Sequence, residues 1–507
     1  MKKLWLLFLG ILVALVFTGC LLHPFGRGGS LGRPTSARDY FDYSAWDVKE
    51  GEVLVKANAV GSLEDVLVKE GSVISREWPE IGWVAATVPE GETVGSFMDT
   101  LKGYKEVLLV EPNLRYTLPV QRGVGELEIL VEPEGDLYDR QWGFTNINAE
   151  AAWDLTVGAP DVIVAIIDTG VDVGHSEFLG KMFVDGYDAT GEGMPDVDLN
   201  GHGTHVAGIA ADDGRTGQVG GVAWDSPIMP VRVMNSAGEI LTEYLIDALE
   251  YLALYAAVFE QRIVANMSLG GRGYSYALKD AIDLAISQGV VVIAAAGNEY
   301  NRSIAYPAAY NGVVSVAAST PRNERADFSS TGWWNSVAAP GERILSAYRD
   351  GYAYASGTSM AAPFVSGAAA LLLAEYPELT PLEVKNQLEQ TAQGVGFNER
   401  LGHGVIDMLA MLGPVEPMAY GTLVVETDLD PKADGYGVIT LFASDGSLAG
   451  YGTIGGDGSH TFHGLAQGKY KVTLTYWDAP AEGWEIVFKE VHVNLGSVAE
   501  AKFRLDT

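Results

Sequence analysis

The stretch VIVAIIDTGVD at residues 162–172 decides the fold that the sequence predicts. Six consecutive apolar residues lead into Asp168, and Thr169 and Gly170 follow as a turn. A run that is apolar at every position is typical of a strand buried on both faces of a parallel sheet. Open α/β sheets carry their sites at the carboxyl ends of their strands, so Asp168 is a candidate functional residue. An Asp that ends a strand is more often a turn or capping residue, so this stretch alone does not assign a role.

The same pattern, an apolar run that ends in a turn, recurs along the chain and predicts an α/β domain with helices on both faces of a parallel sheet. Two further apolar runs end in polar or glycine-rich turns, and helical patterns lie between the runs. A last helix starts with a capping box of Thr380 and Glu383 and has Pro381 at its first position. The expected strands are RIVANMSLGG at 262–271 and GVVVIAAAGN at 289–298, and the expected helices are at 241–256, 276–287 and 379–392.

A second segment, NGHGTHVAGIAA at residues 200–211, places two histidines at the start of a helix rich in Ala and Gly. His202 and His205 are three residues apart and therefore lie on one face of that helix. A shared metal ion is one interpretation, but the HExxH spacing is absent and no third ligand is evident. We therefore favour a structural role for His205.

A third segment, GTSMAAPFVSGAAALLLA at residues 357–374, predicts a long apolar helix that is buried. Ser359 stands at its start, where free N–H groups and the positive end of the helix dipole favour negative charge. Gly357 permits a close approach to the chain, and Pro363 falls within the first turns, where a missing N–H costs least. The alternative is that Ser359 only caps the helix, which is the commonest role of such a serine.

Taken together, the three segments favour catalytic roles for Asp168, His202 and Ser359 over these structural alternatives. They give Asp168, His202 and Ser359 in the chain order of the subtilisin catalytic triad. Each segment also matches the signature around its residue, so residues 136–413 resemble the subtilisin-like serine proteases. The resemblance implies that Ser359 is the nucleophile, that His202 is the general base and that Asp168 orients the imidazole.

The resemblance also assigns the residues around the reacting carbonyl group. In VVVIAAAGNE at residues 290–299, Asn298 corresponds to the asparagine whose side-chain amide forms the oxyanion hole with the Ser359 N–H. Two segments correspond to the walls of the substrate pocket, and neither carries a charge, so we expect an apolar or broad preference for the side chain before the cut. Their residues are Ser268, Leu269 and Gly270 on one side and Ala295, Ala296 and Gly297 on the other.

Structural calcium is a further implication of the resemblance, because family members bind it through acidic residues and a loop near the triad. Asp136 and Glu177 match two of these positions, and the loop DDGRTGQVGG at 212–221 is a candidate third, although it departs in length and lacks the usual Asn pair. Asp198, shortly before His202, is a candidate ligand of a second site. Oxygen ligands suit Ca²⁺, but on composition each acid is more often a solvated surface carboxylate than a ligand. The chemistry itself needs no cofactor.

The charge balance argues against nucleic-acid binding. The 507 residues include 66 acidic and 33 basic side chains, which gives a formal net charge of −33. Nucleic-acid binding requires a basic surface. An acidic surface suits a protein that is exposed to an extracellular medium, and no specific partner is needed to explain it.

The N-terminus predicts export. A positive start precedes an apolar run from Leu4 to Phe17 that is short for a membrane span. FTGC at residues 17–20 resembles a bacterial lipoprotein signal in which Cys20, the one cysteine of the chain, is lipidated, although Phe17 departs from the usual Leu. An ordinary signal peptide or an uncleaved anchor is the alternative. With a lipidated Cys20 the protein would stay at the membrane through its lipid anchor, or be released by processing.

Changes in composition and in the pattern of apolar residues divide the chain into six parts. Residues 45–119 interleave strand and helix patterns and resemble the subtilase inhibitory propeptide, ending at VEPNLRY. The last part alternates at period two between Gly and Asp turns, which predicts an all-β sandwich. The parts are a lipoprotein signal at 1–19, a tether at 20–44, the propeptide-like α+β domain at 45–119, a processing linker at 120–135, the α/β catalytic domain at 136–413 and the sandwich at 414–507.

We therefore expect an exported serine endopeptidase that removes its own propeptide and then cuts proteins or peptides. Two alternatives were weighed against it. A surface adhesion protein that kept the fold but lost activity would show degenerate catalytic positions, yet all four are present. A processing protease of narrow specificity would have a charged pocket, yet the pocket segments are uncharged. The sequence does not decide what the C-terminal sandwich does.

Overall fold

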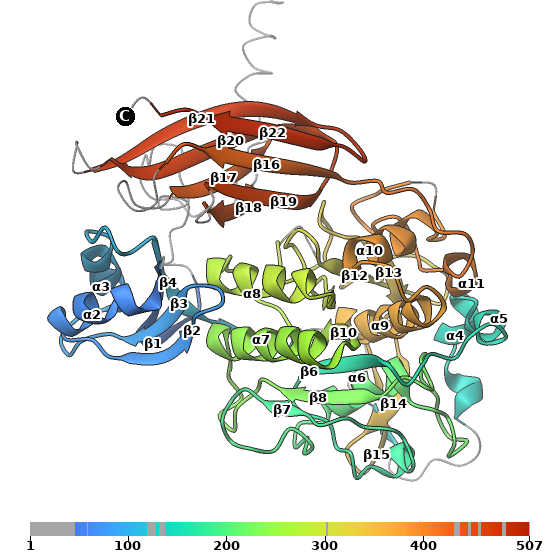
Figure 1. Cartoon of the computed structure of the whole chain (residues 1–507). Coiled ribbons are helices and arrows are strands. Elements are labelled where there is room, and N and C mark those ends of the chain that lie inside the picture. Colours follow the sequence, from blue (N-terminus) through green and yellow to red (C-terminus); the bar gives the residue numbers. More distant parts are fainter. Residues whose placement is uncertain are drawn as a thin grey trace, which may run out of the picture. The chain divides into compact units, whose positions relative to one another are not determined.

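The computed structural model describes residues 46–57, 59–118, 128–130, 137–300, 303–394, 396–429, 437–444, 448–454, 458–478 and 483–505. The predicted signal and tether, most of the processing linker, and with them Cys20 and Asp136, lie outside the described residues. Within the described residues the elements form three groups along the chain, which are blue, teal to orange, and red in Figure 1.

A seven-stranded parallel sheet is the centre of the middle group, as the unbroken apolar runs predict. Its strands are β6 (Val162–Asp168), β7 (Tyr187–Asp188), β8 (Ile228–Arg232), β10 (Arg262–Met267), β11 (Val291–Ala295), β12 (Val314–Ser319) and β13 (Val337–Pro340). They are ordered β13-β12-β11-β10-β6-β8-β7, and every neighbouring pair is parallel. Val164 and Ile166 of β6 enter one apolar core and Ile163 and Ile167 enter the other, because successive side chains of a strand point to opposite faces.

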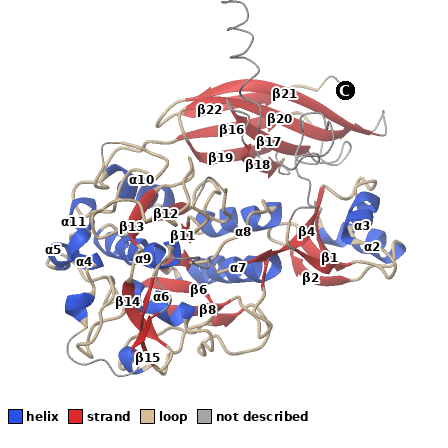
Figure 2. Ribbon diagram, turned by 180° about the vertical axis from the view of Figure 1, so that it is seen from behind, coloured by secondary structure: helices blue, strands red, loops and turns tan. Residues whose placement is uncertain are grey.

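Helices cover both faces of this sheet (Figure 2). The helices that share the first core are α6 (His202–Ala211), α9 (Thr358–Glu375) and α10 (Pro381–Gln390), and those that share the second are α7 (Thr242–Phe259) and α8 (Tyr276–Ser287). Among the described residues α9 alone is long and apolar enough to cross a membrane, but 89% of its apolar window is buried inside the protein, so it is a core helix. The predicted capping box of Thr380 and Glu383 is present at the start of α10.

The N-terminal group is a sheet of order β2-β3-β1-β4-β9 with two helices on one face. Its elements are β1 (Val48–Lys56), α2 (Glu64–Lys69), β2 (Ile74–Trp78), β3 (Trp83–Thr87), α3 (Val94–Leu101) and β4 (Leu109–Tyr116). The last strand of the sheet, β9 (Ile240–Leu241), comes from the middle group and pairs antiparallel with β4, with Tyr116 opposite Ile240. This sheet therefore continues from the N-terminal part into the middle part of the chain.

The C-terminal group consists of two sheets that enclose one apolar core, as the period-two pattern predicts. Leu423 and Val425 enter this core from one sheet, and Ile439 and Leu441 enter it from the other. The sheets are ordered β19-β16-β22 and β18-β17-β20-β21. Their strands are β16 (Gly421–Thr427), β17 (Gly437–Ala443), β18 (Leu448–Thr453), β19 (Ser459–Leu465), β20 (Gly468–Asp478), β21 (Gly483–Val493) and β22 (Val498–Phe503).

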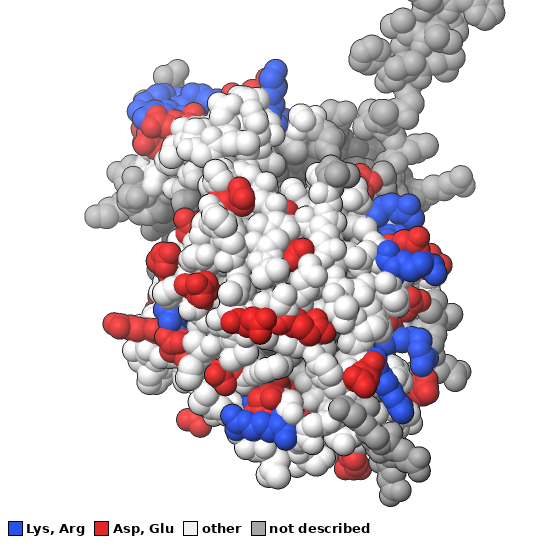
Figure 3. Space-filling view, turned by 90° about the vertical axis from the view of Figure 1, so that its right-hand side faces the viewer, with Lys and Arg blue, Asp and Glu red and all other residues white. Residues whose placement is uncertain are grey.

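The remaining described elements are short. A fifth sheet, of three strands among the described residues, has the order β14-β15-β5. These elements are η3 (Val60–Ser62), β5 (Glu128–Leu130), η4 (Tyr138–Arg140), α4 (Gly143–Asn146), α5 (Ala149–Trp153), η5 (Ser176–Phe178), β14 (Ile344–Tyr348), β15 (Gly351–Ala355) and α11 (Met408–Met411). Acidic side chains predominate on the face in Figure 3, in line with the excess of Asp and Glu in the sequence. The predicted fold class, a parallel α/β sheet between a small α+β part and a β sandwich, is confirmed.

Candidate active site

The carboxyl ends of three neighbouring strands carry the candidate residues. Asp168 is the last residue of β6, Ser268 directly follows β10, and Asn298 lies three residues after β11. Because β6, β10 and β11 are adjacent and parallel, these ends meet at one edge of the sheet. This is the edge at which open α/β sheets place their sites.

Asp168 and His202 form a direct pair. The Nδ1 atom of His202 lies 2.8 Å from Oδ1 of Asp168, whose side chain is fully buried. The Thr169 N–H also donates to this oxygen at 2.7 Å. Burial tends to lower the pKa of His202, but the charge and hydrogen bond of Asp168 outweigh it and hold the pKa above its ordinary value. Because Nδ1 is engaged by Asp168, Nε2 is the nitrogen that remains for a reacting group.

Two glycines allow this pair to form. A Cβ atom on Gly203 would lie 2.0 Å from the Gly170 carbonyl oxygen and 3.2 Å from the Asp168 Cβ. Gly170 has a φ of +106°, and a Cβ there would lie 2.5 Å from the Val197 carbonyl oxygen. The start of α6 therefore packs against the end of β6 with no room for a side chain, which brings His202 to Asp168.

Asp198, the proposed ligand of a second metal site, holds the loop before α6. Its carboxylate accepts five hydrogen bonds, from the Thr169 hydroxyl, the Asn200 and Gly201 N–H groups and both the N–H and hydroxyl of Thr204, at 2.8–3.1 Å. These contacts replace a cap at Gly201, which has no side chain. Both oxygens are used in this way, so we do not extend a calcium proposal to Asp198.

His205 is separate from the pair. Its Nε2 lies 2.9 Å from the Ala353 carbonyl oxygen, and the side chain is buried. Burial lowers the pKa of His205 to about 4, so the ring is neutral near pH 7. These contacts support the structural role that we favour for it.

Ser359 is the second residue of α9 and does not cap it. The N-cap is Gly357, whose backbone is extended, and it has no side-chain hydrogen bond. The Ser359 hydroxyl donates to the Ser268 carbonyl oxygen at 3.2 Å, and the Ser268 hydroxyl donates to the Ser359 carbonyl oxygen at 2.8 Å. These bonds fix the start of α9 to the end of β10. A hydrogen bond from Ser359 to His202 remains a prediction.

Asn298 is held so that its amide faces the start of α9. Its Oδ1 accepts from the Thr358 N–H at 2.9 Å and from the Thr358 hydroxyl at 3.0 Å. The point where a Cβ of Gly357 would lie is 3.2 Å from Asn298 Nδ2 and 3.6 Å from the Ser359 nitrogen. The Asn298 amide nitrogen and the Ser359 backbone nitrogen therefore both lie beside Gly357, which is compatible with the oxyanion hole that the sequence predicts.

Sequence reasoning missed two residues that orient this site, Thr358 and Asn266. Asn266 in β10 is fully buried, donates to the Ser268 hydroxyl at 2.9 Å and accepts from the Ser366 hydroxyl of α9 at 2.9 Å. It therefore links β10 to α9 beside the nucleophile candidate. An Asn inside an otherwise apolar strand was the available signal, because a buried amide needs partners on a neighbouring element.

The predicted pocket segments lie where the strands end. Gly270 forms two 2.9 Å backbone hydrogen bonds with Thr117, one in each direction. Leu269 is buried in the core that also contains Tyr116. The N-terminal part therefore runs along one predicted wall. The remaining wall residues are Ser268, Ala295 and Ala296, all buried, and Gly297, which has a φ of +101°.

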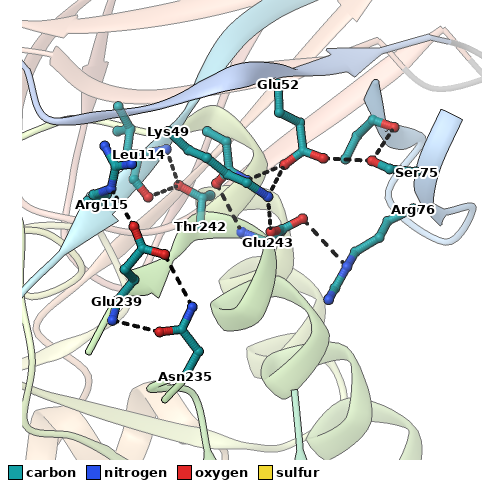
Figure 4. A network of polar contacts seen from close by, with 12 residues as sticks. Lys49, Glu52, Ser75, Arg76, Leu114, Arg115, Asn235, Glu239, Thr242 and Glu243 are labelled. Carbon is teal, nitrogen blue, oxygen red and sulfur yellow. Dashed lines mark hydrogen bonds and ion pairs between the residues drawn. The ribbon is translucent and has the colours of Figure 1, made fainter. Parts of the chain in front are cut away.

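Polar contacts join the N-terminal part to the start of α7 (Figure 4) and, through Glu111, to the start of α8. Glu243 in the first turn of α7 pairs with Lys49 at 2.8 Å and with Arg76 at 3.5 Å. Glu111 accepts from the Ser275 hydroxyl at 2.6 Å and from the first N–H groups of α8, where the dipole favours a carboxylate. The N-terminal part is therefore bound to the helix ends beside the site.

Comparison with known proteins finds relatives in the same family that the sequence motifs resemble. The Subtilase family matches residues 159–404. Subtilisin DY of Bacillus licheniformis is 39% identical over 278 residues, which are 53% of this chain and 97% of that protein. Subtilisin E of Bacillus subtilis is 32% identical over 417 residues, 81% of this chain and 98% of that protein. The crystal structure of fervidolysin from Fervidobacterium pennivorans, described as a keratinolytic enzyme related to subtilisin, matches with a TM-score of 0.71 and 25% identity, over 90% of this chain and 78% of that one.

Proposed function

Because the chain belongs to the subtilase family and is a serine endopeptidase, we propose that it is exported, removes its own N-terminal part and then cuts other proteins with Ser359 as nucleophile. The observation that carries this proposal is the 2.8 Å pair of His202 and Asp168 at the sheet edge where Ser268 anchors the start of α9. The oriented Asn298 adds the fourth catalytic position. A binding protein that lost its activity would have no need to keep all four.

In the proposed mechanism His202 takes the proton of Ser359 through Nε2 while the hydroxyl attacks the peptide carbonyl carbon. Asp168 keeps Nδ1 protonated and stabilises the imidazolium that forms. The amide of Asn298 and the N–H of Ser359 hold the negative oxygen of the tetrahedral intermediate. His202 then protonates the leaving amine, and water attacks the acyl-enzyme through the same groups.

The substrate class follows from the family and from the pocket segments. We propose protein and peptide substrates with an apolar or broad preference at the side chain before the cut, because the segments around Leu269 and Ala296 carry no charge. The keratinolytic description belongs to fervidolysin, and only the general class, protein, is extended to this chain. A processing protease of narrow specificity would need a charged wall.

The N-terminal part is proposed to be an inhibitory propeptide at 45–119, with the cut in the linker 120–135. Two contacts support this. Thr117 pairs with Gly270 in the predicted pocket wall, and Tyr116 pairs with Ile240 on the other side. An extended segment held on both edges next to Ser268 lies as a substrate strand would. The signal at 1–19, and anchoring through Cys20, complete the proposal for export.

A serine-directed reagent tests the function. Treating the matured protein with an aryl sulfonyl fluoride should stop hydrolysis of a peptide library and add one label, because a serine beside a general base reacts far faster than other serines. Tandem mass spectrometry should place the label on Ser359 and not on Ser366 of the same helix. A label spread evenly over many serines, with hydrolysis unaffected, would contradict the proposal.

We also propose a structural calcium ion beside Glu177, because two buried acidic side chains, Glu177 and Asp212, lie there and would balance its positive charge. Glu177 is fully buried and accepts from Thr216 and, at 2.6 Å, from Tyr352. Asp212, which opens the loop 212–221, is also buried, and its Oδ2 has no hydrogen-bond partner. Burial and the Glu177 charge raise the pKa of Asp212. The described residues hold no cluster of three or more acidic, His or Cys side chains, so the remaining ligands would be neutral oxygen atoms such as backbone or amide carbonyls and water.

Removing calcium should therefore lower the melting temperature. On the Ser359→Ala chain, where self-digestion does not interfere, a chelator should lower Tm by roughly 5–10 °C, which corresponds to a ligand present at about 100 times its Kd. Asp212→Asn should make Tm insensitive to calcium. It should not lower the calcium-free Tm, because it removes a buried carboxylate that repels Glu177. Differential scanning calorimetry measures both, and a calcium response that survives in Asp212→Asn would exclude this site.

A further inference from the structure

One carboxylate on α8 is shared by all three groups of the chain. Asp280 accepts hydrogen bonds from Lys56 of β1, from the Trp83 indole of β3 at 2.7 Å and from the Tyr451 hydroxyl of β18 at 2.7 Å. Lys56 and Trp83 belong to the N-terminal part, and Tyr451 belongs to the C-terminal sandwich. The three donors are separated from Asp280 by 224, 197 and 171 residues.

This contact is shielded from water. The side chains of Lys56 and Asp280 are 8% and 14% exposed, and Tyr451 is 1% exposed. In such surroundings, removing one partner of an ion pair is strongly destabilising, because it leaves an uncompensated buried charge. Surface ion pairs, in contrast, contribute little. The shared carboxylate is therefore an energetically important contact of the N-terminal part.

Besides its hydrogen bond to Asp280, the sandwich contacts the N-terminal part directly, through Tyr451 and Lys56. The Lys56 ammonium lies 5.7 Å from the centre of the Tyr451 ring and 5.8 Å from that of Trp83. A cation between two aromatic faces is stabilised by both. Tyr451 is itself fixed by a T-shaped contact with Tyr276 at 4.3 Å. The sandwich thus supplies one wall of the position that Lys56 occupies.

Apolar side chains extend the same contact. Val438 and Phe442 of β17 belong to one buried core together with Trp83 and Tyr451. This core also contains residues of α7 and α8. Because all three parts bury apolar surface in this core, the dissociation of any one of them would expose that surface to water, which costs free energy. The N-terminal part would therefore leave behind an exposed face on both α8 and the sandwich.

We propose that the C-terminal sandwich is part of the binding site for the cleaved N-terminal domain and delays its release. This inference rests on the proposed function, in which the linker 120–135 is cut. After the cut the domain stays bound through β4 and β9, the Glu243 contacts and the shared carboxylate. Its departure removes Lys56 and Trp83 from Asp280, while Tyr451 remains. The sandwich acts by prolonging inhibition, so activity follows the cut only after a lag.

The test follows maturation of the full chain. Gel analysis gives the time of the cut, and hydrolysis of a peptide substrate in the same samples gives the time at which activity appears. Tyr451→Leu removes the ring that lies 5.7 Å from the Lys56 ammonium, a contact that is lost when the N-terminal domain leaves, so the cut should keep its rate while the lag shortens about tenfold. Lys56→Met should shorten the lag at least as much. The double variant should show less than the product of the two effects, because both remove the contact between Lys56 and Tyr451.

Matched controls separate this effect from a general loss of stability. Tyr470→Leu also removes a buried tyrosine of the sandwich, but one whose hydroxyl donates to the Ala466 carbonyl oxygen within the sandwich at 2.8 Å. Lys69→Met removes a lysine that contacts Tyr104 inside the N-terminal part. Neither should change the lag. A lag that is unchanged in Tyr451→Leu, or equally shortened in Tyr470→Leu, overturns the inference. Absence of any cut in the wild-type chain instead overturns the proposed function.

Discussion

Replacing Ser359 with Ala should lower kcat for peptide hydrolysis by roughly 10⁶-fold and leave the purified chain uncut. The magnitude is the loss known for the corresponding change in subtilisin, a relative of this chain. Ala keeps the N–H that faces the Asn298 amide, so the oxyanion donors remain while the attacking oxygen is lost. Intact mass spectrometry of the wild-type and variant chains over time measures the cut, and a peptide substrate measures the rate.

The control for this experiment is a serine remote from the site. Ser287 at the end of α8 donates only to the Leu284 carbonyl oxygen, so Ser287→Ala should mature and hydrolyse peptide as the wild type does. The variant chain should also bind its own N-terminal part, since Lys49, Glu111 and Lys56 are untouched. If isolated Ser359→Ala is cut in the linker as fast as the wild type, self-processing is wrong.

The central sheet could be predicted because its strands are buried on both faces. The run from Val162 to Ile167 is apolar at every position, which distinguishes it from the half-buried strands of a sandwich. In the C-terminal sandwich a strand such as β21 is hard to predict individually, because its apolar residues Ile486 and Phe488 are 39% and 61% exposed, so apolar positions do not mark its buried face. β2 is hard to predict for a related reason, since Ser75, Arg76 and Glu77 are polar residues in succession and show no apolar alternation.

Each predicted catalytic position lies in a short local motif, whereas other contacts depend on residues far apart in the chain. Thr358 orients Asn298 across 60 residues, and Asp212 meets Glu177 only through folding of a glycine-rich loop. The pairing of Asp280 with Tyr451 joins two parts of the chain with no shared motif. No local pattern predicts such pairs, because the partner of a polar side chain is chosen by packing of the whole fold.

Replacing Asp168 with Asn should lower kcat by roughly 10⁴-fold with little change in the fold. An Asn can still accept from the Thr169 N–H, which now donates to Asp168 at 2.7 Å. It can equally present its amide to Nδ1 of His202, which stabilises the tautomer with the proton on Nε2. That nitrogen then cannot take the proton of Ser359. The loss therefore arises from a wrong tautomer and an unstabilised imidazolium, and pre-steady-state hydrolysis should show a slow acylation step.

The same variant should shift the pH dependence of kcat/KM toward acid. Activity requires neutral His202, so the acid limb marks the loss of its proton. In the wild type Asp168 holds the pKa of His202 above its ordinary value of 6.5, so the limb should lie above pH 6.5. Without the carboxylate, the effect of burial is opposed only by the weaker influence of the Asp198 charge, so the pKa of His202 falls and the limb moves to lower pH. Profiles between pH 5 and 9, with Asp172→Asn as a control that leaves the pair intact, measure the shift. A limb that stays in place in Asp168→Asn would show that another group sets the pKa, and a rate loss below tenfold would remove Asp168 from the triad.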